Sequence, residues 1–108
     1  MKTIRILLSD DHTVVREGLR ALLESTDSIE VVAEVANGRQ AVAETKRLLP
    51  DVVLLDLSMP LLNGVEAARQ ITREVPLTRV LILSAYSDDH YVQHAIEAGA
   101  AGYLMKQA

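Results

Sequence analysis

The chain has 108 residues, of which 49% are hydrophobic and 24% charged, and its formal net charge is -4. This length suits one globular domain. The negative charge, without a cluster of Lys and Arg, argues against nucleic acid as a direct ligand, and the lack of cysteine excludes disulfides, thiolate metal sites and cysteine nucleophiles.

No apolar stretch is long enough to span a bilayer, and the mostly apolar segment 52–65 is interrupted by Asp56 and Pro60. Met1-Lys2-Thr3 leads directly into a strand-like segment, with none of the apolar core of a signal peptide. We therefore expect a cytoplasmic protein that has no membrane partner.

The first segment, residues 4–8, is apolar apart from Arg5 and predicts a strand that ends at two acids, Asp10 and Asp11. From Thr13 onward the apolar residues recur at helical spacing, which predicts an amphipathic helix that closes near Ser25. The expected inward face of this helix consists of Val15, Leu19, Leu22 and Leu23.

Residues 29–36 alternate well enough to predict a strand near the edge of a sheet. Asn37, followed three residues later by Gln40, resembles a capping box, and the second helix that it opens should end at Pro50. The apolar run at 52–55 then predicts a buried strand that delivers Asp56 to a loop closed by Pro60.

Asn63 can cap a third helix that ends before Pro76. Residues 79–83 predict a further buried strand, which ends at Ser84. A fourth helix capped by Ser87 or Asp88 and stopped by Gly99 precedes a last short strand, residues 100–105, which ends at Lys106.

Strands that alternate with helices predict a parallel sheet with right-handed crossovers. In such a sheet the carboxyl ends of the strands share one edge, so we expect the polar residues that follow them to gather there. Three carboxylates so close together must hold a proton or bind a cation, and an oxygen donor set suits Mg²⁺. An aspartate beside a metal ion and a lysine is a plausible nucleophile towards phosphorus. The residues expected at this edge are Asp10, Asp11, Asp56, Ser84 and Lys106.

These motifs in this order resemble the receiver domain of bacterial response regulators. The Asp-Asp-His opening and the Gly-Tyr-Leu-Met-Lys ending look most like the NarL/FixJ-type branch, whose receivers usually precede a helix-turn-helix DNA-binding domain. The resemblance implies an α/β, flavodoxin-like, doubly wound sheet of five parallel strands in the order 2-1-3-4-5. It is carried by Asp10-Asp11, by Asp56 in Asp-Leu-Ser-Met-Pro, by Gly64, by Ser84-Ala85 and by residues 102–106.

The resemblance also implies the metal site. Asp56 would accept a phosphoryl group from a sensor histidine kinase. Asp11 would bind Mg²⁺ (or Mn²⁺) directly and Asp10 mainly through water, with the main-chain carbonyl of Ser58 as a further ligand.

Around this centre, the resemblance implies a set of residues that respond to the phosphoryl group. Lys106 would contact the phosphoryl oxygens, Ser84 would hydrogen-bond one of them, and Tyr103 would move towards the space that Ser84 vacates, altering the surface of the fourth helix and fifth strand. The side chains at Ser58 and Tyr86 occupy positions that tune dephosphorylation in such proteins.

Several of these residues also have simpler interpretations. Asp10 and Asp11 could cap the first helix, a role compatible with metal binding. His12, His90 and His94 are interpreted as surface or loop residues that lack the paired acid of a metal or catalytic site, with His90 and Tyr91 as weak candidates for partner contact.

The chain departs from the receiver pattern after Lys106, where receivers usually continue through a proline into a fifth helix. Here the sequence reads Gln107-Ala108 and stops. We therefore expect residues 1–108 to form a receiver domain truncated after the fifth strand, without the fifth helix, and we expect self-association to cover the apolar face that this helix would occupy.

The expected function is a phosphorylation switch that catalyses only its own phosphorylation and dephosphorylation, and that controls an output through DNA-binding transcription regulation. One alternative is a phosphorylation-independent dimerisation module. Another is an aspartyl phosphatase like the haloacid dehalogenases, although that class needs a second acid where this chain has Ser58. A dinucleotide-binding domain is excluded because no G-x-G-x-x-G follows the first strand.

Overall fold

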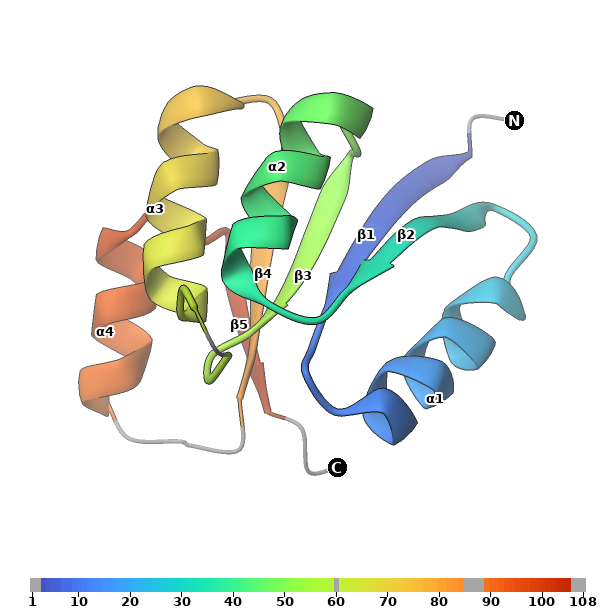
Figure 1. The fold of residues 1–108 in the computed structure, drawn as a ribbon, viewed down its shortest axis with the longest axis horizontal. Helices are drawn as coiled ribbons and strands as arrows, with labels where there is room; N and C mark the ends of the chain where they lie inside the picture. The colour runs from blue at the N-terminus through green and yellow to red at the C-terminus, as the bar shows by residue number, and fades with distance from the viewer. Residues whose placement is uncertain (1–2, 60, 85–88, 106–108) are drawn as a thin grey trace.

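The computed structural model describes residues 3–59, 61–84 and 89–105. This part of the chain forms one parallel sheet of five strands in the order β2-β1-β3-β4-β5, with four helices (Figure 1). The predicted strand order and α/β class are confirmed. The elements are β1 (Ile4–Ser9), α1 (Thr13–Glu24), β2 (Ile29–Val35), α2 (Gly38–Leu48), β3 (Val52–Asp56), α3 (Gly64–Glu74), β4 (Arg79–Ser84), α4 (Asp89–Glu97) and β5 (Gly102–Met105).

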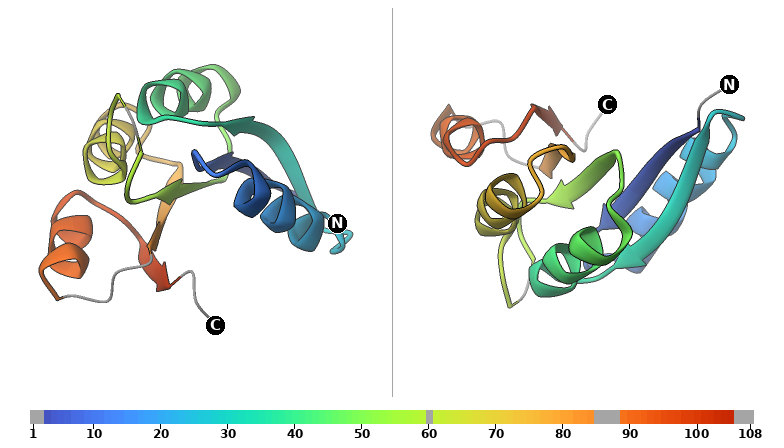
Figure 2. Two further views of the ribbon diagram at one scale, coloured as in Figure 1. Left: turned by 60° about the horizontal axis from the view of Figure 1, so that its bottom comes forward. Right: turned by 90° about the horizontal axis from the view of Figure 1, so that it is seen from above.

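Helices cover both faces of the sheet unequally. Helices α2, α3 and α4 lie together on one face, whereas α1 lies on the other, next to β1 and β2 (Figures 1 and 2). The larger core joins strand residues such as Leu7, Leu55 and Ile82 to Ala68 and Ile71 of α3, all of them fully buried. The smaller core, on the α1 face, is formed by Ile6, Leu8, Val31, Leu54 and Leu83.

Two asparagines cap their helices as predicted. The Asn37 side chain accepts a hydrogen bond from the Gln40 amide at 2.9 Å, and the Asn63 side chain accepts one from the Glu66 amide at 3.0 Å. In a capping box the Gln40 side chain would accept a hydrogen bond from the Asn37 amide. Here it accepts one from the preceding amide, that of Ala36, at 3.2 Å. The predicted caps of α4, Ser87 and Asp88, lie outside the described residues.

The inward face predicted for α1 is only half right. Leu19 and Leu23 pack against the smaller core, but Val15 is 37% exposed and Leu22 68% exposed, and no residue of α1 is buried. The reason is that α1 contacts β1 and β2 along one narrow side, while no described segment lies over its other flank. Exposed apolar side chains therefore remain on α1.

None of the helices in the described part of the chain has the length and apolar character that crossing a membrane requires.

Candidate metal centre

The sheet register brings the candidate acids to the same edge. Strands β1 and β3 run parallel with Ser9 opposite Leu55, so Asp10 and Asp56 follow at the same level. Asp56 is in turn opposite Leu83 of β4, which puts Ser84 one residue beyond it. The predicted gathering of these strand ends at one edge is confirmed for the described residues.

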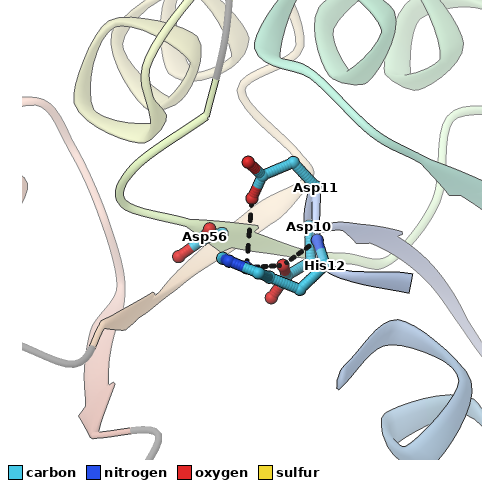
Figure 3. A group of neighbouring side chains, drawn as sticks. All are labelled: Asp10, Asp11, His12 and Asp56. Carbon is cyan, nitrogen blue, oxygen red and sulfur yellow. Dashed lines mark hydrogen bonds and ion pairs between the residues drawn. The ribbon is translucent and has the colours of Figure 1, made fainter. Parts of the chain in front are cut away.

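Four side chains meet there, three from the loop after β1 and one from the end of β3. One ligand atom from each of Asp10, Asp11, His12 and Asp56 can be chosen so that all four lie within 4.8 Å of one another (Figure 3). Asp10 is 1% exposed and Asp56 3%, whereas Asp11 and His12 are exposed. The cluster therefore has a buried floor of two carboxylates and an open side that faces solvent.

The loop after β1 is fixed largely through Asp10. Its amide donates to the Val35 carbonyl of β2 at 3.1 Å, and its carbonyl accepts from Arg16 Nη1 at 2.7 Å. Its Oδ1 accepts from the His12 amide at 2.8 Å. The Asp10 side chain thus closes a tight turn before α1. This helix begins at Thr13, and the side chain of its N-cap residue, His12, makes no capping hydrogen bond.

The loop after β3 is held just as closely. The Leu57 amide donates to the Leu83 carbonyl of β4, and the Gly64 amide donates to the Leu57 carbonyl, both at 2.9 Å. Ser9 at the end of β1 donates through its hydroxyl to Met59 Sδ, 3.0 Å away. These contacts tie the backbone that follows Asp56 to both neighbouring strands and to the start of α3.

The donors present fit a divalent cation. Carboxylate oxygens are the ligands that hard ions such as Mg²⁺ and Mn²⁺ prefer, and three carboxylates lie within reach of a single ion. Either buried carboxylate could act as a nucleophile next to that ion. The solvent-facing side of the cluster would give a second reactant access to it.

The other predicted site residues are placed as follows. Ser84 is 1% exposed at the end of β4, and Tyr103 of β5 is half-buried against the larger core, opposite Ile82. Ser58 is exposed in the loop after β3. Lys106 and Tyr86 lie outside the described residues.

The interpretation of His12 as lacking a paired acid is wrong. Its Nδ1 lies 3.1 Å from Asp10 Oδ1 and 3.2 Å from Asp11 Oδ1. The sequence gives little warning of this contact, because the backbone conformation of the loop decides whether the side chains of adjacent residues point to the same place. The tight turn that Asp10 closes brings the imidazole back over the two acids (Figure 3).

Comparison with known proteins decides the family. The sequence model of the response regulator receiver domain family matches residues 6–108. The chain belongs to this family. This receiver domain is 43% identical over 103 residues to the transcriptional regulatory protein LnrK of Bacillus subtilis, covering 95% of this chain and 47% of that protein. It is 46% identical over 103 residues to LiaR of the same organism, covering 95% and 49%. The chain thus spans about half the length of these curated relatives.

Solved structures agree with the receiver fold. The signal receiver domain of the putative response regulator NarL from Mycobacterium tuberculosis superposes with a TM-score of 0.95 at 38% identity, covering 100% of this chain and 87% of that one. A LuxR-family two-component response regulator from Aurantimonas sp. SI85-9A1 gives a TM-score of 0.94 at 39% identity, covering 99% and 76%. The receiver is therefore a signalling domain of the two-component type, and its relatives are transcriptional regulators.

Proposed function

We propose that Asp56 is the phosphoacceptor of this receiver. The observation that carries the proposal is the position of its carboxylate, which is 3% exposed at the end of the central strand β3 and within 4.8 Å of two further carboxylates. A carboxylate oxygen of Asp56 forms a bond to phosphorus while the bond from phosphorus to a histidine nitrogen of the kinase breaks. The product is an aspartyl phosphate.

Asp10, Asp11, Asp56 and the main-chain carbonyl of Ser58 are the proposed ligands of Mg²⁺ or Mn²⁺. When bound, the ion supplies positive charge that neutralises the transferring oxygens and helps to orient them. The hydrogen bonds that fix the loop after β1 support this assignment for Asp10 and Asp11, because a ligand held in position loses little freedom when an ion binds.

The proposed response passes from Ser84 to Tyr103. The Ser84 hydroxyl donates to a phosphoryl oxygen and Lys106 contacts another, which draws the end of β4 towards Asp56. Tyr103, half-buried on the α4 side of β5, then moves inward and changes the α4/β5 surface. Phosphorylation must favour the active state by about 5.5 kcal/mol to shift the populations from 1:99 to 99:1. The side chains of Ser58 and Tyr86 tune the rate of dephosphorylation.

The proposed partners follow from the branch of the family. The receiver acts in the cytoplasm, where a sensor histidine kinase supplies the phosphoryl group. DNA is contacted through a helix-turn-helix domain of the longer regulator rather than by these residues. The receiver also self-associates through the exposed apolar side chains of α1 and β5, which include Val14 at 81% exposed, Leu22 at 68% and Leu104 at 48%.

The switch is tested with Mg²⁺ and beryllofluoride, which mimics the phosphoryl group. We expect NMR signals of Ser84, Tyr103 and residues around Asp56 to shift in the parent and in Asp27→Asn, a control that removes an exposed carboxylate from the loop before β2. Asp56→Asn should show none of these shifts. An Asp56→Asn chain that responds like the parent would overturn the assignment of the acceptor.

A further inference from the structure

The side chain of His12 lies against the proposed metal site, although the proposed set of ligands gives it no role. Its imidazole is 63% exposed, and its Nδ1 lies 3.1 Å from the Oδ1 atom of Asp10 and 3.2 Å from that of Asp11. The ring extends from the loop over the carboxylate cluster (Figure 3). It is the one nitrogen donor among the four side chains of this cluster.

These separations match those between neighbouring ligands of one metal ion. In octahedral coordination with bonds of about 2.1 Å, adjacent ligand atoms are about 3.0 Å apart and opposite ones about 4.2 Å. The Nδ1 atom of His12 is near the adjacent-ligand distance from both acids, and ligand atoms of the whole cluster fall within 4.8 Å. The spacing of His12 from both acids therefore suits adjacent ligands of one ion.

The backbone that carries the ring is also held in place. The His12 amide donates to Asp10 Oδ1 at 2.8 Å, so the imidazole and the carboxylate belong to the same closed turn. An ion that binds both groups therefore fixes few additional rotatable bonds. A site that is arranged before binding loses less conformational entropy when the ion binds.

We propose that His12 is a nitrogen ligand of the receiver's cation site and determines its metal preference. Imidazole favours first-row transition ions such as Ni²⁺ and Zn²⁺, whereas Mg²⁺ prefers oxygen. The site then binds Mg²⁺ through its oxygen ligands alone and a transition ion through those oxygens and His12. This inference rests on the proposed function, because it uses the same carboxylates as ligands.

A simpler role for His12 is a hydrogen bond to the two acids. The two roles predict different results when the ring is replaced, since an amide side chain hydrogen-bonds a carboxylate but is a poor ligand for Ni²⁺. His12→Gln therefore separates hydrogen bonding from coordination, and His12→Ala removes both.

The experiment measures Ni²⁺ and Mg²⁺ affinities by calorimetry at one fixed pH on the untagged parent, His12→Ala, His12→Gln and His94→Ala. His94 is a control on α4. We expect both His12 variants to bind Ni²⁺ about tenfold more weakly or worse and to bind Mg²⁺ within about twofold of the parent. The control should match the parent for both ions.

A spectroscopic measurement identifies the ligand directly. With Cu²⁺ as the probe, pulsed EPR should show imidazole nitrogen coupling in the parent and in His94→Ala, and should lose it in both His12 variants. The inference is overturned if the nitrogen signal persists without His12, if His12→Gln binds Ni²⁺ like the parent, or if Ni²⁺ and Mg²⁺ affinities fall together.

The failure of this inference is distinguishable from failure of the proposed function. The parent should become phosphorylated at Asp56 with acetyl phosphate and Mg²⁺. If it does and His12→Ala keeps the Ni²⁺ preference of the parent, only the role of His12 is wrong. If the parent binds no divalent cation, both proposals fall.

Discussion

The α-carbon of Gly64 lies so close to the backbone of Asp56 that a β-carbon at position 64 would be 2.3 Å from the Asp56 carbonyl oxygen. It would also lie 2.9 Å from the α-carbon of Leu57. Helix α3 therefore begins in direct contact with the proposed phosphoacceptor, and only a residue without a side chain permits that approach.

Gly64→Ala should move either α3 or the Asp56 backbone. We expect a loss of about 2 to 3 kcal/mol in unfolding free energy, as for other overpacked sites, together with slower phosphorylation by acetyl phosphate. Urea denaturation and phosphorylation kinetics measure the two effects.

Gly18→Ala provides the matched control, because a β-carbon there meets nothing within 4 Å in the middle of α1. Replacing a mid-helix glycine should raise stability by about 0.5 to 1 kcal/mol. A Gly64→Ala chain that is as stable and as reactive as the Gly18→Ala chain would show that the close approach is unimportant.

The strands and the acidic edge could be predicted because short-range signals specify them. Apolar runs of strand length, each ended by a polar residue, are visible in the sequence, and the parallel arrangement follows from the helices between them. Asp10 and Asp56, 46 positions apart, meet because β1 and β3 are paired in register.

Other features could not be predicted because they depend on three-dimensional packing. The spacing of Gly64 from Asp56 was visible as part of a motif, but its physical reason is the backbone contact between α3 and the end of β3. The helical pattern of α1 likewise marked Leu22 as apolar without showing which flank the sheet would cover. The turn that places His12 over the acids is set by hydrogen bonds of Asp10.

Arg16 should stabilise the loop that carries the first two acids. Its Nη1 donates to the Asp10 carbonyl at 2.7 Å, and its Nε donates to Glu34 of β2 at 3.2 Å. Arg16→Ala removes the donor from that carbonyl, and we expect a loss of about 1 to 3 kcal/mol in urea denaturation.

Arg20 is the comparison for Arg16, because it pairs with Glu34 and Glu24 at the surface and none of its described hydrogen bonds reaches Asp10. Arg20→Ala should cost clearly less than Arg16→Ala. Equal losses from the two variants would mean that the shared ion pair with Glu34, and not the contact with Asp10, accounts for the stability.

A pH effect is expected on α2, where the hydrogen bond from Arg47 lowers the pKa of the Glu44 carboxyl below its ordinary value. Since the folded pKa is the lower one, the pair stabilises the fold above the unfolded pKa, and this contribution is lost as the pH falls through the folded pKa. Arg47→Gln should raise the pKa of Glu44 in an NMR titration, whereas Arg39→Gln on the same helix should leave it unchanged. An unaltered Glu44 titration in Arg47→Gln would refute the pairing.

Self-association should depend on the apolar flank of α1. Sedimentation velocity should show a dimer that forms with increasing concentration, and Leu22→Glu should shift it to monomer because a carboxylate cannot be buried in an apolar interface without a partner. Leu77→Glu is the control, since Leu77 is 92% exposed on the loop between α3 and β4. A folded parent that stays monomeric at high concentration would contradict the proposal.

The most direct test of the central claim is mass spectrometry after incubation with acetyl phosphate and Mg²⁺. An Asp56 oxygen should attack phosphorus and displace acetate, adding the mass of one phosphoryl group, and peptide mapping should locate it at Asp56. Asp27→Asn should gain the same mass and Asp56→Asn should gain none. A phosphoryl group on another residue of the parent, or undiminished labelling of Asp56→Asn, would contradict the assignment.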